Sequence, residues 1–368
     1  MEKEIIKIGP PDYVLLFMVL LLASFGVIMI LSASPSVGYE YFGDPFYFIK
    51  RHLFYLFLGF CAFIFGLVVN YQEFKKYSFI LIIAIIVLLV LTSLPGLGVI
   101  AGGARRWLNL RIFLFQPSEL AKIIVVLFLA NAIEKKREKI TDFWRGLIPL
   151  LSVVGIIVLF ILKQPDLGTT LVIVSLAIIM LFVGGAKSTH ILTIVFTGLA
   201  GTVAVILRNP YQMQRIFGYL NPWKDPLGIN FHVIQSWIAV GSGGIFGLGL
   251  GGSKLKYSYL PQQYTDFIFA ILCEEGGFIF SAIVVIVLML FMIRCFRIIL
   301  KVQNDFERHL TLGLSMYLVC QAVLNLCVVL GVLPATGVPL PFISFGGTSL
   351  IISFFTCGLL ANISRRIN

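Results

Sequence analysis

The chain has 368 residues, of which 59% are hydrophobic and 12% are charged, and its mean hydropathy is +1.00. A soluble domain averages about 25% charged residues, so this composition excludes an ordinary soluble protein. The net charge of +11 is not gathered into a basic tail or block, and we therefore expect no nucleic acid partner.

Ten apolar runs approach the roughly 20 residues that a helix needs to cross a bilayer. They cover 13–32, 53–70, 77–95, 117–133, 147–162, 168–186, 189–207, 266–292, 309–331 and 346–363. Apolar and polar residues do not alternate as they do in a β-barrel. No small-residue cleavage site follows the first run, so we interpret it as a span rather than a signal peptide. The sequence predicts an all-α, polytopic integral membrane protein in which residues 1–368 form one domain.

The distribution of basic residues predicts the side of the membrane on which each loop lies. With the amino terminus inside, the short cytoplasmic segments are densely basic, as the positive-inside rule requires. The predicted outer segments also retain cations, which are Arg105, Arg106, Arg111, Arg208, Arg215 and Lys224. This retention favours a task such as holding a phosphate, and pairing with lipid headgroups is the alternative.

The first outer motif is Gly-Gly-Ala-Arg-Arg-Trp-Leu at 102–108. Arginine presents a fixed fork of donors that matches phosphate oxygens, and glycine lets a ligand approach the backbone. Arg105 and Arg106 are therefore candidates for binding a diphosphate. A simple anchor at the membrane interface is the alternative.

The fourth predicted helix begins with Gln-Pro-Ser-Glu-Leu-Ala-Lys at 116–122, which contains Glu119 and Lys122. Residues three apart share a helix face, and charges inside a span are costly unless they pair or face a wet cavity. The two residues therefore form either the wall of a polar cavity or a structural ion pair that ties helices together. Both descriptions can hold at once.

Other acidic residues lie at or near predicted helix starts. Asp166, in Gln-Pro-Asp-Leu-Gly-Thr, is predicted to cap the sixth span, because a carboxylate there accepts from free backbone amides. Glu274 and Glu275 follow Asp266 by about eight residues, or roughly 12 Å of helix. Adjacent side chains point in different directions, so we expect only one of these two glutamates to face a cavity.

A long outer loop, about 208–265, separates the seventh and eighth predicted helices. Its Arg215 and Lys224 are further candidates for holding a diphosphate. We expect its glycine-rich apolar stretch, 234–252, to lie in the interface or dip partly into the membrane. The loop ends in Leu-Pro-Gln-Gln-Tyr-Thr-Asp, and the final residue, Asp266, lies where the chain re-enters the bilayer. We therefore expect the function at the outer face.

The last connection, 334–349, is rich in proline and glycine and is predicted to break regular helix. Such irregular backbone is tolerated at membrane depth only where it lies against protein or water.

Taken together, these motifs resemble the SEDS family (shape, elongation, division and sporulation), whose members include FtsW and RodA. The resemblance covers the whole chain and also includes Asn-Pro-Trp-Lys-Asp-Pro, Thr-Asp-Phe-Ile-Phe-Ala and Pro-Leu-Pro-Phe-Ile-Ser-Phe-Gly-Gly-Thr-Ser. Segments 43–51 and 215–217 are more similar to the division member, whereas 334–341 is more similar to the elongation member. Weighed together, they make the chain slightly more similar to FtsW.

The resemblance implies a peptidoglycan glycosyltransferase of the cytoplasmic (inner) membrane whose active face is outside. Its substrate would be lipid II, the undecaprenyl-diphosphate-linked disaccharide-pentapeptide. Its partners would be a class B penicillin-binding transpeptidase and other divisome or elongasome proteins. The resemblance also implies that Asp266 is the essential loop aspartate and that Glu119 and Lys122 form a buried ion pair. Gln262 and Tyr264 stand where family members often have Glu and His, which could change the pKa or the metal environment of Asp266.

In this reaction the 4-hydroxyl of an acceptor sugar attacks an anomeric carbon as the lipid diphosphate leaves. Asp266 could act as general base, and the four cations Arg105, Arg106, Arg215 and Lys224 could stabilise the leaving diphosphate. Alternatively, Asp266 could bind a divalent cation such as Mg²⁺ or Mn²⁺ that does the same electrostatic work.

Two other classes of function are alternatives to a glycosyltransferase. A transporter of the lipid-linked precursor would also use buried charges and broken helices. The charge on the predicted outer face and the lack of a visible inverted repeat in the sequence favour the enzyme. A non-catalytic scaffold would leave Glu119, Lys122 and Asp266 without an explanation.

Overall fold

Each predicted span corresponds to one helix in the structure. The computed structural model describes residues 9–101, 104–208, 213, 218–224, 231–256 and 263–367. The ten helices are α1 (Tyr13–Ala33), α3 (Tyr47–Val68), α4 (Tyr71–Ser93), α5 (Pro117–Lys135), α6 (Ile148–Lys163), α7 (Leu167–Val183), α8 (Ser188–Arg208), α11 (Ile268–Lys301), α12 (Asp305–Val329) and α13 (Gly347–Ser364). Seven helices in the described ranges are long and apolar enough to cross a membrane. The protein is thus a multi-pass membrane protein, and the number of ten spans stays a prediction.

Side chains that the sequence places before the helices explain where several helices begin. The carboxylate of Asp12 accepts from the backbone N–H of Leu15 at 3.1 Å and caps α1. The amide oxygens of Asn70 and Asn304 accept from backbone N–H groups in the first turns of α4 and α12. These caps satisfy donors that a helix start otherwise leaves unpaired.

Two helices extend well beyond their predicted ends. α3 begins at Tyr47 instead of residue 53, and α11 continues to Lys301 instead of residue 292. The added turns contain charged residues such as Lys50, Arg51 and Arg297, which ended the apolar runs in the sequence. An apolar run indicates only the part of a helix that contacts lipid. The helix itself continues further, because its backbone hydrogen bonds do not require apolar side chains.

A small antiparallel sheet, which the sequence did not predict, accompanies the helices of this mainly helical fold. Its strands are β1 (Gly98–Ala101), β2 (Ala104–Asn109) and β3 (Leu114–Phe115), in the order β1-β2-β3. Val99 pairs with Trp107, and Leu108 pairs with Phe115. Strands of four, six and two residues are too short to produce a clear two-residue hydrophobic pattern. The sheet contacts α4 and α5 and carries Arg105 and Arg106.

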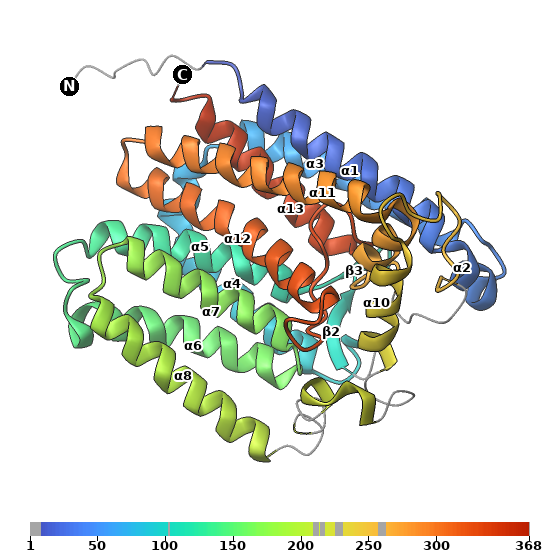
Figure 1. Ribbon diagram of the computed structural model, residues 1–368. Helices are drawn as coiled ribbons and strands as arrows, with labels where there is room; N and C mark the ends of the chain where they lie inside the picture. The colour runs from blue at the N-terminus through green and yellow to red at the C-terminus, as the bar shows by residue number, and fades with distance from the viewer. Residues whose placement is uncertain are drawn as a thin grey trace.

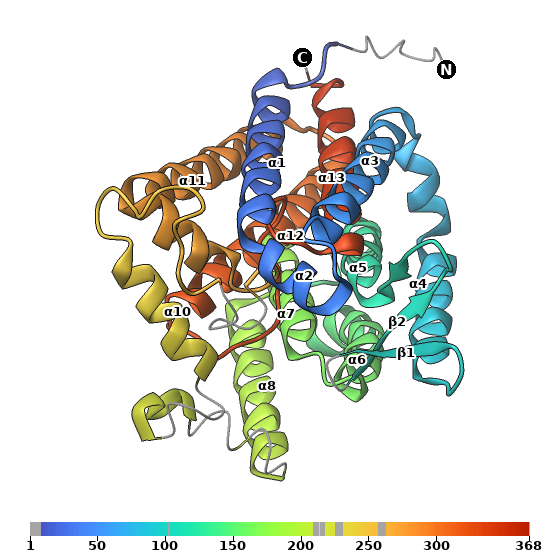
Figure 2. The ribbon, with the colours of Figure 1, turned by 90° about the vertical axis from the view of Figure 1, so that its right-hand side faces the viewer.

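Short helices fill several of the connections between the long helices. They are α2 (Pro35–Phe42), the π-helix η1 (Phe143–Leu147), the 3-10 helix η2 (Pro222–Lys224) and α10 (Phe231–Ser242). α10 contacts α11 and α12 and contains the first part of the glycine-rich stretch 234–252. In Figure 1 the sheet, α2 and α10 lie at one end of the bundle, and the start of α1 and the end of α13 lie toward the other. Figure 2 shows the same separation after a quarter turn.

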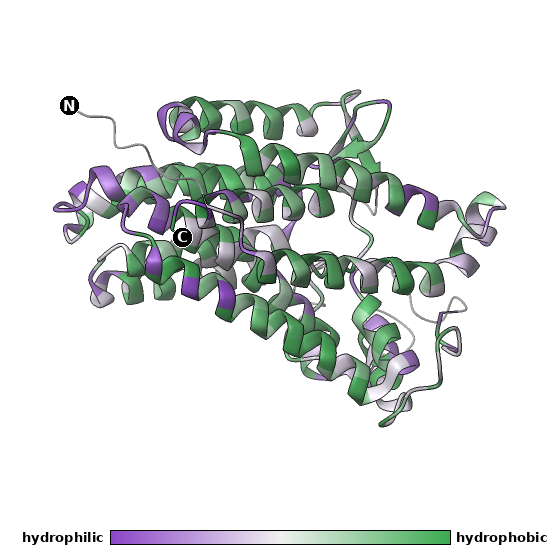
Figure 3. Cartoon of the chain, turned by 90° about the horizontal axis from the view of Figure 1, so that it is seen from above, coloured by the Kyte–Doolittle hydropathy of each residue, from purple (hydrophilic) through white to green (hydrophobic). Residues whose placement is uncertain are grey.

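The helices differ in how much of their surface is covered by protein. α13 is largely enclosed and packs along α3, and α5 packs against α4, α7 and α12. Large apolar side chains such as Phe57, Leu159 and Phe196 remain exposed on outer helices, where lipid would cover them. Figure 3 shows hydrophobic colour along most helix lengths and hydrophilic colour mainly in loops and near helix ends.

The connection between α12 and α13 is buried against protein, as predicted. Leu340, Phe342 and Ile343 are almost completely enclosed, and Phe342 has a positive φ of 66°. α1 passes close by because it has glycine at position 26, where a Cβ atom would collide with the carbonyl oxygen of Phe342. This connection therefore forms a fixed internal wall at the sheet end of the bundle.

Candidate active site

Asp266 lies in the turn just before α11, beside the connection between α12 and α13. Its backbone carbonyl accepts from the side-chain amide of Asn325 at 2.8 Å, and the same amide donates to the carbonyl of Val338 at 2.8 Å. Its carboxylate faces Gly337, where an added Cβ atom would lie 3.7 Å from Oδ2. Asp266 is half-buried. Asn325 on α12 thus fixes the backbone of Asp266 to the buried connection.

The surroundings of Asp266 raise its pKa from the ordinary value to about 6. Burial is the largest cause, because it disfavours the charged form. The negative charge of Asp166 raises the pKa further, and the positive charge of Arg106 lowers it. At neutral pH the carboxylate is therefore mainly ionised but more basic than an ordinary aspartate, which suits a general base.

Arg106 is anchored to the turn that precedes α7. Its Nε donates to the carbonyl of Gln164 at 2.9 Å, and its Nη2 donates to the carbonyl of Pro165. Gln164 is itself held, because its side-chain amide donates to the carbonyl of Leu89 on α4. The guanidinium thus has a fixed place next to Asp166 and retains further N–H donors for a ligand.

Asp166 caps α7, as predicted. Its Oδ1 accepts from the backbone N–H of Thr169 at 3.1 Å. Its Oδ2 accepts from the Thr169 hydroxyl at 2.9 Å and from the side-chain amide of Gln116 at 3.2 Å. These contacts join the start of α5 to the start of α7. Asp166 therefore builds the site in addition to acting on the pKa of Asp266.

The predicted cations differ in their position relative to Asp266 and in their exposure. Arg105 and Arg106 are neighbours on β2, so their side chains leave opposite faces of the strand. Lys224, at the end of η2, is exposed, and Arg215 lies outside the described residues. Of the predicted cations that the structure describes, Arg106 is the one whose charge acts on the pKa of Asp266.

The predicted ion pair between Glu119 and Lys122 is present. Lys122 Nζ lies 2.7 Å from Glu119 Oε1, and their side chains are only 1% and 4% exposed. Lys122 also donates to Gln321 Oε1 at 2.9 Å, and Gln321 in turn donates to the carbonyl of Pro339 at 3.1 Å. The burial favours a structural tie over the wall of an open cavity. The pair connects α5, α12 and the connection that flanks Asp266.

Gln321 and Asn325 hold this connection in place, and neither was predicted as a site residue from the sequence. They are four residues apart on α12, so they share one face of the helix. Polar side chains in a membrane span usually face the bundle interior and have partners there. The four-residue spacing of these two polar residues within an apolar run could therefore have indicated them from the sequence.

The described residues contain no group of three or more His, Cys, Asp or Glu side chains that could hold a metal ion. At this site Asp266 and Asp166 offer two carboxylates as metal ligands. The carboxylate of Asp166 already accepts hydrogen bonds from Thr169 and Gln116.

Comparison with known proteins gives a consistent result along the whole chain. The family model for FtsW, RodA and SpoVE, described as cell cycle protein, matches residues 13–368. Stage V sporulation protein E of Bacillus subtilis (strain 168) is 41% identical over 355 residues, covering 96% of this chain and 97% of that protein. A probable peptidoglycan glycosyltransferase FtsW of Geobacter sp. (strain M18) is 39% identical, covering 97% of each.

A solved structure described as the structural coordination of polymerization and crosslinking by a peptidoglycan synthase complex contains a similar chain. That chain matches with a TM-score of 0.81 and 32% identity, covering 97% of this chain and 98% of its own length. Sequence and fold agree: this chain belongs to the FtsW/RodA/SpoVE family of cell cycle proteins.

Proposed function

We propose that this chain is a peptidoglycan glycosyltransferase that polymerises lipid II, with Asp266 as its general base. The observation that carries the proposal is the position of Asp266, which has a raised pKa and lies within electrostatic reach of the anchored Arg106. The names of its relatives support the same activity, since several are called probable peptidoglycan glycosyltransferase.

The proposed step is a displacement at a sugar carbon. Asp266 takes the proton from the 4-hydroxyl of the acceptor sugar, and the freed oxygen forms a bond to the anomeric carbon of the donor. The bond from that carbon to the diphosphate oxygen breaks, and undecaprenyl diphosphate leaves with the bonding electrons. The product is a glycan longer by one disaccharide.

The leaving diphosphate requires positive charge nearby. Arg106 is the strongest candidate because its guanidinium is fixed by two backbone carbonyls and acts on Asp266. Arg105, Arg215 and Lys224 remain candidates for holding the rest of the diphosphate. A divalent cation on Asp266 is the alternative source of this charge.

We further infer that the protein lies in the cytoplasmic membrane with Asp266 on the outer side. The basic short loops predicted for the opposite side support this orientation. A class B penicillin-binding transpeptidase is the proposed partner, because a structurally similar chain belongs to a complex that coordinates polymerization and crosslinking. Other division or elongation proteins would join the same assembly.

The decisive experiment supplies lipid II to the purified chain in detergent micelles, with and without a class B transpeptidase, and separates the products by gel. No bilayer has to be crossed in micelles, so a polymerase makes glycan strands there and a transporter does not. We expect strands, and addition of a chelator tests the cation alternative. Absence of polymer, together with movement of labelled lipid II across proteoliposomes, would establish the transporter instead.

A further inference from the structure

α11 is interrupted at Gly277, and a segment of the long loop fills the interruption. Gly277 has φ 65° and ψ −168°, which no helix contains. The backbone groups on both sides of the break bind residues of the loop: Leu248 N to Glu274 O at 3.0 Å, Gly249 N to Glu275 O at 3.0 Å, Phe278 N to Gly244 O at 2.9 Å and Ile279 N to Ile245 O at 3.2 Å. The loop therefore replaces hydrogen bonds that the helix lacks, as a broken helix in a membrane protein requires.

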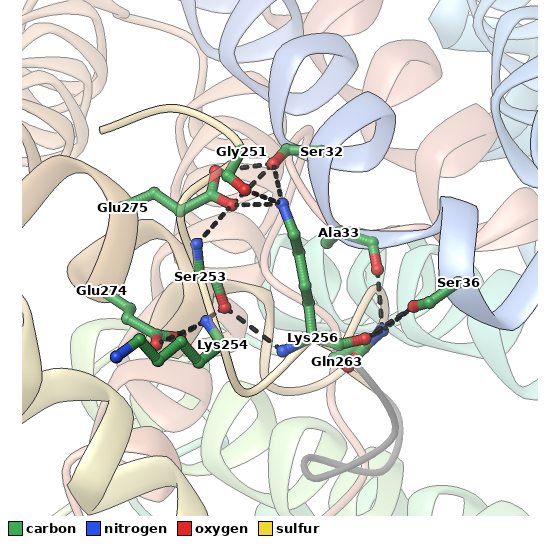
Figure 4. Close-up of polar contacts among 10 residues, drawn as sticks. All are labelled: Ser32, Ala33, Ser36, Gly251, Ser253, Lys254, Lys256, Gln263, Glu274 and Glu275. Carbon is green, nitrogen blue, oxygen red and sulfur yellow. Dashed lines mark hydrogen bonds and ion pairs between the residues drawn. The ribbon is translucent and has the colours of Figure 1, made fainter. Parts of the chain in front are cut away.

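The side chains just before this break bind the same loop (Figure 4). Glu275 accepts from Lys256 Nζ at 3.1 Å and from the hydroxyl of Ser32, on α1, at 2.7 Å. Glu274 accepts from the hydroxyl of Ser253 and from the backbone N–H of Lys254 at 3.0 Å. Both glutamates are 1% exposed. We expected only one of them to face a cavity, and the structure shows that residues of the loop bind both.

Lys256 connects this cluster to the residues that precede Asp266. Its Nζ also donates to the carbonyl of Gly251 at 2.7 Å. Its own backbone carbonyl accepts from the side-chain amide of Gln263 at 2.7 Å and from the hydroxyl of Ser36 at 2.6 Å. Gln263 is completely buried and stands three residues before Asp266. Figure 4 shows Lys256 between Glu275 on one side and Gln263 on the other.

Gln263 is in turn fixed to α1, because its amide also donates to the carbonyl of Ala33 at 2.8 Å. Asp266 is thus held from two directions. Asn325 binds its backbone carbonyl from α12, and the contacts of Glu275, Lys256 and Gln263 secure the chain that leads into it.

We infer that the buried Glu275–Lys256 ion pair is a positioning element for catalysis, which sets the place of Asp266 through Gln263. The inference rests on the proposed role of Asp266. A carboxylate that accepts a proton in the transition state must be placed to within a fraction of an ångström, and small displacements cost large factors in rate. The ion pair supplies that precision because two opposite charges that are buried together hold the side chains of Lys256 and Glu275 in one arrangement.

The test uses two neutral substitutions, Lys256→Met and Glu275→Gln, singly and together, in the lipid II assay with purified protein. Each single variant removes one charge of the buried ion pair and keeps the other, so both thermal stability and kcat should fall. The double variant removes both charges, so its melting temperature should return close to that of the unaltered chain. We expect its kcat to stay about tenfold or more below the unaltered value, with KM within about twofold, because only positioning in the transition state is lost.

A less buried ion pair elsewhere in the bundle serves as the control. Lys75 on α4 and Glu134 on α5 form an ion pair at 2.6 Å, away from the proposed site. The double variant Lys75→Met with Glu134→Gln should keep the kcat of the unaltered chain. Gln263→Met is a further test variant that changes no charge, since it removes the hydrogen bonds to the carbonyls of Lys256 and Ala33 and to the hydroxyl of Ser36. It should lower kcat by about tenfold at unchanged KM.

The outcomes separate the two proposals. If the stable double variant and Gln263→Met both polymerise at the unaltered kcat, the pair is a structural feature only and the inference is overturned. If the double variant does not fold, Gln263→Met decides alone. If the unaltered chain makes no glycan, or Asp266→Asn is fully active, the proposed function fails and not the positioning inference alone.

Discussion

Among single side chains, the environment of Asp266 determines the pH at which the chain can work. Burial and the charge of Asp166 raise the pKa of Asp266 to about 6, and the base is the deprotonated form. The polymerisation rate should therefore increase with pH and reach half of its maximum near pH 6. Initial rates measured from acid to neutral pH check this. A rate that stays constant down to pH 4 would rule out Asp266 as the titrating base.

Asp166→Asn provides a second check on the same profile. Asparagine can still cap α7 through its amide oxygen, so the fold of the turn is retained. The substitution removes the negative charge that raises the pKa of Asp266. The midpoint of the rate profile should therefore move to lower pH, and a shift to higher pH would contradict the electrostatic account.

Arg106 and Arg105 form a natural comparison because they are adjacent on β2 and differ in placement. Arg106 is bound to the carbonyls of Gln164 and Pro165 and acts on Asp266. Arg106→Gln should lower kcat by about 100-fold, as loss of one transition-state donor typically does. Arg105→Gln should have a much smaller effect. Equal effects of the two substitutions in the lipid II assay would contradict the assignment of Arg106.

Some of these residue contacts could be predicted and others could not. The cap by Asp166 and the pair of Glu119 with Lys122 are local, because their partners lie three residues away and helix geometry brings them together. Lys256 and Glu275 are nineteen residues apart in the sequence. Their contact depends on how the loop folds around the break in α11, which no local spacing reports.

At the scale of helices and loops, the main prediction concerns the stability of a variant at Gly277. A side chain there would be strained by the positive φ, and its Cβ would collide with the backbone N of Gly247. Gly277→Ala should therefore destabilise the protein by about 1–3 kcal/mol or more. Gly155→Ala on α6 is the control, since nothing lies within 4 Å of its added Cβ. Thermal unfolding in detergent compares them, and equal melting temperatures would contradict the tight fit of the loop in the break.

A second prediction at this scale concerns the contribution of the buried pair Glu119 and Lys122 to the packing of the helices. It joins α5 to α12 through Gln321, and removal of one partner leaves an uncompensated charge. Lys122→Met should cost about 3–5 kcal/mol, and Lys122→Met with Glu119→Gln should recover most of that loss. A double variant no more stable than the single one, in the same unfolding measurement, would show that the pair does not act as a unit.

The elements themselves follow from the sequence where the hydrophobic signal is long. All ten apolar runs contain a helix, and Asp12, Asn70 and Asn304 mark three of the starts. The sheet, α2 and α10 could not be identified in this way, because they are short and their stability comes from contacts with neighbouring helices. These are also the elements that gather near Asp266.

For the whole molecule, the structure separates two ends with different chemistry. Gly9 and Arg365 join the terminal segments at one end through a hydrogen bond of 2.8 Å. The sheet, the turn before α7, the connection before α13 and the start of α11 meet at the other end (Figures 1 and 2). The helices thus act as a frame that brings Asp266, Asp166 and Arg106 together from distant parts of the chain.

The central claim is that polymerisation of lipid II depends on the carboxylate of Asp266. Its most direct test compares Asp266→Asn with the unaltered chain in the micelle assay, with the transpeptidase partner present. Asp44→Asn is the control, because Asp44 is a solvent-accessible acid that pairs with the exposed Lys50 and with the backbone of its own turn. The account predicts that Asp266→Asn folds and binds its partner but makes no glycan, while Asp44→Asn polymerises normally. Glycan synthesis by Asp266→Asn at the unaltered rate would contradict it.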